Sequence, residues 1–132
     1  MRQDKTNCNR ALVVEDEPVI SLICQRTLMA MGFDVDIAAN GLEAKNMVND
    51  TKYDLCLSDI RTPAMNGIEF YEYLENKHDD LAGKVIFMTG DVMSHSVNTF
   101  LKEINRPFLP KPFTPDELKG VVQEALKQTV DG

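Results

Sequence analysis

The sequence predicts an α/β fold, a doubly wound parallel sheet of five strands with helices on both faces. Short apolar runs alternate five times with segments whose apolar residues recur at helical spacing. The segments between these runs are long enough to carry the chain back across the sheet, which parallel strands require. Several runs are apolar at every position, as expected for strands that are covered on both faces.

The first half of the chain is expected to form three strands and two helices. Residues 11–14 are an apolar strand, and residues 19–31 are a helix with one apolar face. Residues 35–38 form the second strand, in a stretch where apolar and acidic residues alternate as they do at a sheet edge. A helix over 42–48 and a third strand over 55–58 follow.

The second half repeats this alternation twice. A helix over 68–75 precedes an apolar strand over 85–88, and a helix over 96–104 precedes a short strand over 108–110. Prolines bound that last strand, and because proline has no N–H to donate, the strand belongs at an edge. The last helix begins at Thr114, which is followed by a proline and, three residues on, by a glutamate; this is a capping box.

These features together predict the strand order 2-1-3-4-5. The first, third and fourth strands are the most continuously apolar and are placed at the centre, with the second and fifth at the edges. In this order the first and third strands are neighbours, so their carboxyl ends bring Glu15, Asp16 and Asp59 together. We expect residues 1–132 to form a single domain with a core over about 10–127.

Composition excludes several classes of protein. The net charge is −7, and the chain lacks the basic residues that a nucleic-acid-binding surface needs. Direct nucleic-acid binding is therefore not expected. No apolar run approaches the roughly 20 residues that span a membrane, and the first residues lack the apolar segment of a signal peptide. Three cysteines without paired spacing favour neither a disulfide framework nor a zinc site. We therefore expect a cytoplasmic protein.

The carboxylates at the strand tips predict a metal site. Two unit charges about 4 Å apart repel by roughly 4 kcal/mol at an effective dielectric near 20, so Glu15, Asp16 and Asp59 need a cation or protonation. Oxygen ligands without cysteine or histidine select Mg²⁺, with Mn²⁺ as a substitute. A metal there stabilises charge on a phosphoryl group, and Asp59 is placed to accept one as a carboxylate nucleophile.

Two other strand tips carry groups that suit a phosphoryl group. Lys111 follows the fifth strand and supplies a positive charge. Thr89 follows the fourth strand and supplies a hydroxyl. The Lys111–Pro112 bond is a candidate for a cis peptide, because the trans preference of a bond to proline is small.

Four segments resemble the receiver domain of bacterial two-component response regulators, in the right order and at the right spacing. They are residues 12–18, 58–67, 88–90 and 109–113. The resemblance extends over nearly the whole chain. Residues 85–91 and 106–111 are similar to receivers that are fused to hybrid histidine kinases, a resemblance of smaller weight.

The resemblance implies a phosphoacceptor and a metal shell. Asp59 is expected to accept the phosphoryl group and to ligate Mg²⁺. Asp16 is expected to bind the metal directly and Glu15 through a metal-bound water. The backbone carbonyl of Arg61 completes the ligands that the protein supplies.

The resemblance also implies a conformational switch. Thr89 and Lys111 are expected to bind the phosphoryl group, and the aromatic ring of Phe108 is expected to turn inward when Thr89 moves. Thr62 stands where the family often has methionine, and no chemical consequence is expected. Apart from the resemblance, Arg61 and Asp91 follow Asp59 and Thr89 by two residues each, and these opposite charges are expected to pair at the mouth of the site and slow the attack of water.

We therefore expect a phosphorylation-controlled switch that catalyses only its own phosphorylation and dephosphorylation and is not otherwise an enzyme. A sensor histidine kinase or a histidine phosphotransfer protein donates the phosphoryl group. The face formed by 96–104, 108–110 and the last helix then changes and binds a downstream protein, and it is also where a homodimer would form.

Two alternatives stay open. The first is a Mg²⁺-dependent phosphatase that forms an aspartyl phosphate, like the haloacid-dehalogenase-like enzymes. Those enzymes have a second acid two residues after the nucleophile, where this chain has Arg61. The second is a receiver-like binding module that is not phosphorylated. His78 and His95 lack the neighbours of a ligand set, and both are expected to face solvent.

Overall fold

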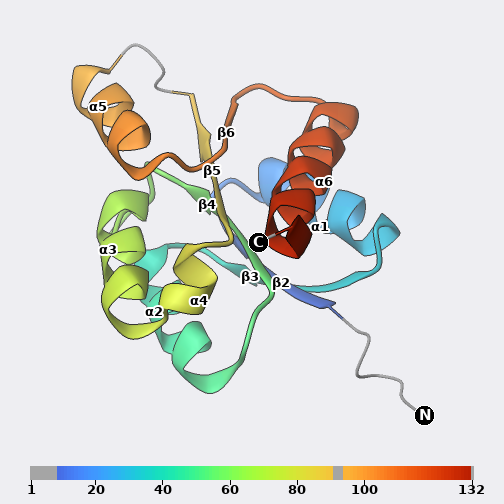
Figure 1. The fold of residues 1–132 in the computed structure, drawn as a ribbon, viewed down its shortest axis with the longest axis horizontal. Coiled ribbons are helices and arrows are strands. Elements are labelled where there is room, and N and C mark those ends of the chain that lie inside the picture. The colour runs from blue at the N-terminus through green and yellow to red at the C-terminus, as the bar shows by residue number, and fades with distance from the viewer. Residues whose placement is uncertain (1–8, 91–93, 132) are drawn as a thin grey trace.

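The computed structural model describes residues 9–90 and 94–131, the last four by their backbone alone. Five parallel strands form one sheet in the order β3-β2-β4-β5-β6 (Figure 1). In chain order this is 2-1-3-4-5, so the predicted topology is confirmed. The strands are β2 (Asn9–Val14), β3 (Phe33–Ala38), β4 (Leu55–Asp59), β5 (Val85–Thr89) and β6 (Phe108–Pro110).

Helices cover both faces of the sheet, as predicted (Figure 1). Helices α1 and α6 lie on one face, and α2, α3 and α5 lie on the other. The helices are α1 (Pro18–Ala30), α2 (Gly41–Asp50), α3 (Gly67–Lys77), α4 (Asp79–Ala82), α5 (His95–Ile104) and α6 (Pro115–Asp131).

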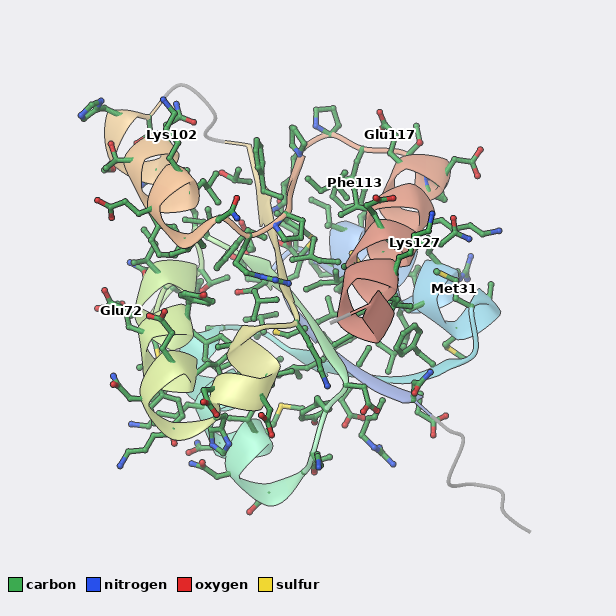
Figure 2. The ribbon with its side chains drawn as sticks, in the orientation of Figure 1. Met31, Glu72, Lys102, Phe113, Glu117 and Lys127 are labelled. Carbon is green, nitrogen blue, oxygen red and sulfur yellow. The ribbon has the colours of Figure 1, made fainter. Side chains whose placement is uncertain are left out.

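Alternate side chains of each central strand enter two separate cores. In β2, Ala11 and Val13 pack beneath α1 and α6, while Leu12 and Val14 pack beneath α2 and α3, and all four are fully buried. Both faces of the strand are therefore apolar, which explains why its sequence does not alternate. Side chains fill the space between the helices and the sheet, while charged ones such as Glu72 and Lys102 point outward (Figure 2).

Side-chain caps set where several helices begin. Thr114 Oγ1 accepts from the Glu117 amide at 3.1 Å, and Glu117 Oε1 accepts from the Thr114 amide at 2.8 Å, so the predicted capping box is confirmed. Asn66 and Glu69 make the same reciprocal pair at the start of α3. The Lys111–Pro112 peptide is cis.

The predictions differ from the structure mainly at element ends and at one short helix. Helix α4 has four residues and was not predicted, because one turn is too short to show a period. Strand β2 begins two residues earlier than predicted, with polar Asn9 and Arg10 paired to β3. Asp91, the expected partner of Arg61, lies outside the described residues, so that pair stays a prediction.

A search of the described residues for membrane-spanning segments found no helix that combines the length and the apolar character that crossing would take.

Candidate functional site

The functional side chains lie where neighbouring strands end. Asp59 ends β4 and Thr89 ends β5, while Glu15 follows β2 and Lys111 follows β6. Val14 pairs with Ser58, and Thr89 pairs with Pro110. Because the strands are parallel and in register, these ends meet at one edge of the sheet.

Three carboxylates converge at this edge, as the strand order predicts. Glu15, Asp16 and Asp59 each place one oxygen so that all three atoms lie within 4.8 Å of one another. Glu15 and Asp59 are buried, while Asp16 is exposed. Burial strengthens the repulsion between the charges, so the cluster depends on a compensating cation.

Lys111 supplies that positive charge. Its Nζ lies 2.7 Å from Glu15 Oε1 and donates a hydrogen bond of 3.0 Å to Asp59 Oδ2. Burial acts to lower the pKa of Lys111, but the contacts with Glu15 and Asp59 outweigh it, so this pKa is raised. The ammonium group therefore stays charged and links the two buried carboxylates.

Glu15 is held in place but is not fully satisfied. Its Oε2 accepts from the Glu17 amide at 3.1 Å. Its Oε1 is buried and close to Lys111 Nζ, yet it has no partner in hydrogen-bond geometry among the described residues. Burial raises the pKa of Glu15 above its ordinary value, the contact with Lys111 opposes the rise, and the charge of Asp59 adds to it.

This arrangement fits a hard divalent cation. Glu15 Oε1 is buried in a cluster of three carboxylate oxygens, which is the ligand chemistry that Mg²⁺ and Mn²⁺ favour. Glu15, Asp16 and Asp59 are the side chains that would hold it. The Arg61 amide donates to Asp59 Oδ1 at 3.2 Å, which places the Arg61 backbone beside the same carboxylate.

An open cleft leads from solvent to these groups. Asp16, Glu17, Asp59, Arg61, Gly90 and Lys111 line it. The sequence places Glu17 in the acidic cluster after β2 without assigning it a role, and its Oε1 lies 3.7 Å from Lys111 Nζ. A third acid beside the lysine makes the mouth of the cleft negative, which favours entry of a cation.

The two residues expected to act as a switch differ in exposure. Thr89 is fully buried, and its carbonyl accepts from the Lys111 amide at 2.8 Å, so the backbone of Lys111 is tied to the end of β5. The Phe108 side chain is on the edge strand β6 and is 39% exposed. The ring thus lies at the surface and does not fill an inner position, and the inward turn stays a prediction.

Thr62 has a structural role that the sequence did not reveal. It is buried, although its neighbours Arg61 and Pro63 are exposed. Its hydroxyl donates to the Met65 carbonyl at 2.9 Å. A comparison of residue types alone could not show this, because the partner is a backbone atom.

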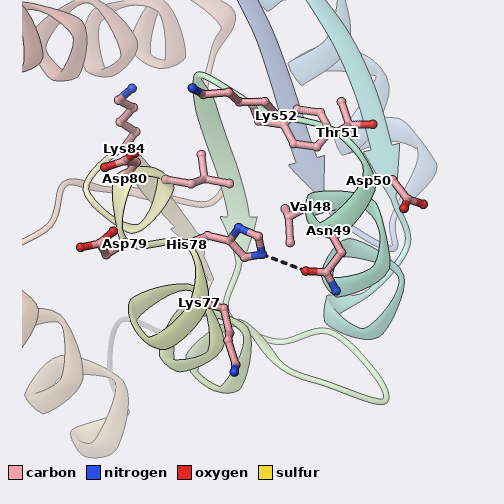
Figure 3. A pocket seen from close by; sticks show the side chains of 12 residues that line it. Val48, Asn49, Asp50, Thr51, Lys52, Lys77, His78, Asp79, Asp80 and Lys84 are labelled. Carbon is pink, nitrogen blue, oxygen red and sulfur yellow. Dashed lines mark hydrogen bonds between the residues drawn. The ribbon is translucent and has the colours of Figure 1, made fainter.

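A second hollow lies at the opposite edge of the sheet, near the amino ends of β4 and β5 (Figure 3). It contains no member of the predicted site. His78 lines it and is half-buried, and its Nε2 lies 2.8 Å from Asn49 Oδ1 in an exposed contact, so the expectation that His78 faces solvent is met only in part. His95 is exposed, as expected.

The chain matches a known protein family over most of its length. Residues 11–123 match the family described as the response regulator receiver domain. The chain is 40% identical over 119 residues to the probable transcriptional regulator ycf29 of Porphyra purpurea, covering 87% of this chain and 55% of that protein. The chain therefore spans about half the length of this relative.

Solved structures share the fold. The chemotaxis protein CheY4 of Vibrio cholerae superposes with a TM-score of 0.79 at 26% identity, covering 89% of this chain and 98% of that one. The receiver domain of the sensor histidine kinase PA1611 of Pseudomonas aeruginosa gives 0.79 at 24% identity, covering 91% and 98%; its structure has a magnesium ion coordinated in the active-site cleft. Together with the matched family, these likenesses show that the chain belongs to the response regulator receiver domains of two-component systems.

Proposed function

We propose that this protein is a phosphoacceptor switch in which Asp59 takes a phosphoryl group from a partner's phosphohistidine, with Mg²⁺ bound at Glu15, Asp16 and Asp59. One observation carries the proposal: Asp59 is buried beside two more acids, and Lys111 Nζ lies 3.0 Å from its Oδ2. The donor is a sensor histidine kinase or a histidine phosphotransfer protein.

The transfer has two steps. A carboxylate oxygen of Asp59 forms a bond to phosphorus while the bond between phosphorus and the donor's imidazole nitrogen breaks, and the imidazole leaves with that electron pair. Water later attacks the phosphorus, which releases inorganic phosphate and restores the carboxylate. The protein therefore catalyses only its own phosphorylation and dephosphorylation, and its role is that of a signalling switch.

The chain's own groups have distinct tasks in this scheme. Lys111 moves from its contacts with Glu15 and Asp59 to a phosphoryl oxygen, and the Thr89 hydroxyl binds another. Bound Mg²⁺ offsets the charge of the acids and of the phosphoryl oxygens. The magnesium ion described for the related PA1611 receiver supports this choice of metal.

The face that meets the donor is expected to be α1. Val19 and Leu22 lie in its first turns and are 71% and 43% exposed, although both are large and apolar. Glu17, which precedes them, lines the cleft. An exposed apolar stripe that starts two residues after a cleft-lining acid suits a helical surface that carries the phosphohistidine.

Output is expected at α5, β6 and α6. Phe108 is exposed on β6, and its inward turn would change this face for a downstream protein or for a second copy of the chain. We also propose a reducing, cytoplasmic location, because Cys24 and Cys56 are buried free thiols. The net charge of −7 gives this domain no basis for direct contact with nucleic acid.

The test is the intact mass of the protein after incubation with Mg²⁺ and acetyl phosphate. We expect a single phosphoryl adduct that requires the metal and is lost in Asp59→Asn. Asp116→Asn, at an exposed acid in α6, is the matched control and should keep the adduct. Turnover of many phosphate esters would favour the phosphatase, and absence of any adduct would favour the inert binding module.

A further inference from the structure

The loop between β4 and α3, residues 60–66, carries the backbone carbonyl that is expected to bind the metal. A carbonyl is a useful ligand only if its peptide plane is held in one orientation. The question is therefore what fixes the peptide that joins Arg61 to Thr62. A role for this loop in holding the metal rests on the proposed metal site.

The two ends of the loop are tied to the sheet and to each other. The Ile60 amide donates to the Met88 carbonyl at 3.0 Å, and the Gly67 amide donates to the Ile60 carbonyl at 2.9 Å. A Cβ atom on Gly67 would lie 2.4 Å from the Asp59 carbonyl oxygen, so the chain closes tightly here. These contacts fix the base of the loop but not its middle.

The middle of the loop is held by the Thr62 hydroxyl. It donates to the Met65 carbonyl at 2.9 Å, and the same carbonyl accepts from the Gly41 amide at 2.9 Å. Ala64, between the bonded residues, has a left-handed backbone with φ of 65°. The side chain of Thr62 thus closes the turn from inside and links it to the start of α2.

We infer that Thr62 is a positioning residue that orients the Arg61 carbonyl toward the metal. On one side of Arg61, its amide is bonded to Asp59 Oδ1 at 3.2 Å. On the other side, the buried Thr62 side chain is bonded to Met65. The peptide that carries the carbonyl is therefore restrained from both directions.

The hydroxyl, and not the shape of the side chain, carries this role. Valine has nearly the same shape as threonine but cannot donate a hydrogen bond, whereas serine keeps the donor and loses a methyl group. Loss of a group that orients a metal ligand typically weakens metal binding by 10- to 100-fold. Because the Met65 carbonyl would still accept from the Gly41 amide, we expect the weakening of metal binding to lie at the lower end of this range, roughly tenfold.

The experiment measures the dissociation constant of Mn²⁺ for the unphosphorylated protein, from the electron paramagnetic resonance signal of the free ion, with Mg²⁺ as competitor. The proteins are wild type, Thr62→Ser, Thr62→Val and Thr62→Ala. Thr99→Val, at an exposed threonine on α5, is the matched control. Urea unfolding in excess chelator reports the metal-free stability of each protein separately.

The inference predicts that Thr62→Val and Thr62→Ala bind Mn²⁺ about tenfold more weakly, while Thr62→Ser and Thr99→Val bind like wild type. It is overturned if Thr62→Val and Thr62→Ala bind like wild type, or if Thr62→Ser binds as weakly as Thr62→Val. If Thr62→Val does not fold, the Mn²⁺ affinity of Thr62→Ala is compared with that of Thr62→Ser instead. If wild type binds neither metal, the proposed function itself is contradicted, which is a different and distinguishable result.

Discussion

At the scale of single residues, Lys111 is expected to have two roles at the same site. Its Nζ lies between Glu15 and Asp59, at 2.7 Å and 3.0 Å, and compensates two buried negative charges. In the proposed phosphorylated state it contacts the phosphoryl group. The residue is thus expected to contribute to both stability and signalling.

Replacing Lys111 by methionine tests the first of these roles. We expect the free energy of unfolding in chelator at neutral pH to fall by about 2 kcal/mol, because two buried carboxylates lose their partner. The loss is below the usual range for a buried pair, since the cleft admits water and Glu15, with its raised pKa, can take up a proton.

Urea unfolding measures the change, and Mg²⁺ should restore part of the loss. Lys119→Met, at an exposed lysine of α6, is the control and should change little. Equal stability of Lys111→Met and wild type in chelator would show that the lysine does not compensate these acids.

Sequence reasoning succeeded for residues whose place follows from strand order. Asp59 ends a strand, and Glu15, Asp16 and Lys111 follow one within two residues, so once the order was derived their meeting was predictable. Thr62 was missed because its partner is a carbonyl in a loop, and no residue pattern encodes that contact. The roles of these residues in binding metal and phosphoryl group remain predictions.

At the scale of elements, the approach of α3 to the end of β4 fixes the base of the site. Gly67, the first residue of α3, leaves no room for a side chain, because an added Cβ would lie 2.4 Å from the Asp59 carbonyl oxygen and 2.8 Å from Ile60 Cα. These neighbours are backbone atoms and cannot move aside cheaply.

Gly67→Ala is therefore expected to lower the free energy of unfolding by about 2 kcal/mol through this overlap. Gly120→Ala in α6 is the matched control, since an added Cβ there meets nothing within 4 Å. Alanine in an open helical position should raise stability by about 0.5–1 kcal/mol. Thermal or urea unfolding gives both values, and changes of the same sign in the two variants would refute the steric explanation.

The apolar stripe on α1 gives a prediction about the donor. Leu22→Lys should slow phosphoryl transfer from a phosphohistidine protein about tenfold, because it places a charge in the expected contact surface. Transfer from acetyl phosphate, which needs no docking surface, should be unchanged. Leu42→Lys, on α2 across the sheet and 50% exposed, is the control. A uniform effect on both donors would place Leu22 outside the docking surface.

Most elements were predictable because their signals are local. The capping box at Thr114 and the apolar period of α5 located those helices within a residue or so. Helix α4 was not predictable from periodicity, since it is a single turn after His78. The structure around α4 depends on contacts between residues that are distant in the sequence, and local sequence patterns do not reveal such contacts.

At the scale of the whole molecule, the strand order follows from burial. Continuously apolar strands fell at the centre, and the alternating and proline-bounded strands fell at the edges. The edge strand β3 is also tied to the domain by a partly buried polar contact, in which the Tyr53 hydroxyl donates to Asp36 Oδ2 at 2.8 Å. That contact gives a stability prediction at high pH.

Burial, with the hydrogen bond to Asp36 adding to it, raises the pKa of Tyr53 from 10.0 to about 12. Between these two pH values the unfolded chain loses the tyrosine proton more readily than the folded protein, so stability falls as pH rises through that window. Tyr53→Phe should cost about 1 kcal/mol at neutral pH, by loss of the hydrogen bond, and should make the alkaline decline shallower.

Unfolding free energies across this range, together with tyrosinate absorbance, measure the effect. Tyr73→Phe, at a hydroxyl bonded to Asn49, serves as the comparison. An alkaline decline of the same steepness in Tyr53→Phe and wild type would exclude Tyr53 as its source.

The most direct test of the central claim is to locate the phosphoryl group. The protein is phosphorylated with Mg²⁺ and acetyl phosphate and reduced with borohydride, which converts an acyl phosphate to an alcohol. Peptide mass spectrometry then identifies the reduced residue. The account predicts homoserine at residue 59 alone, and only in samples that contained the metal. Reduction at another carboxylate, or a metal-independent product, would contradict it.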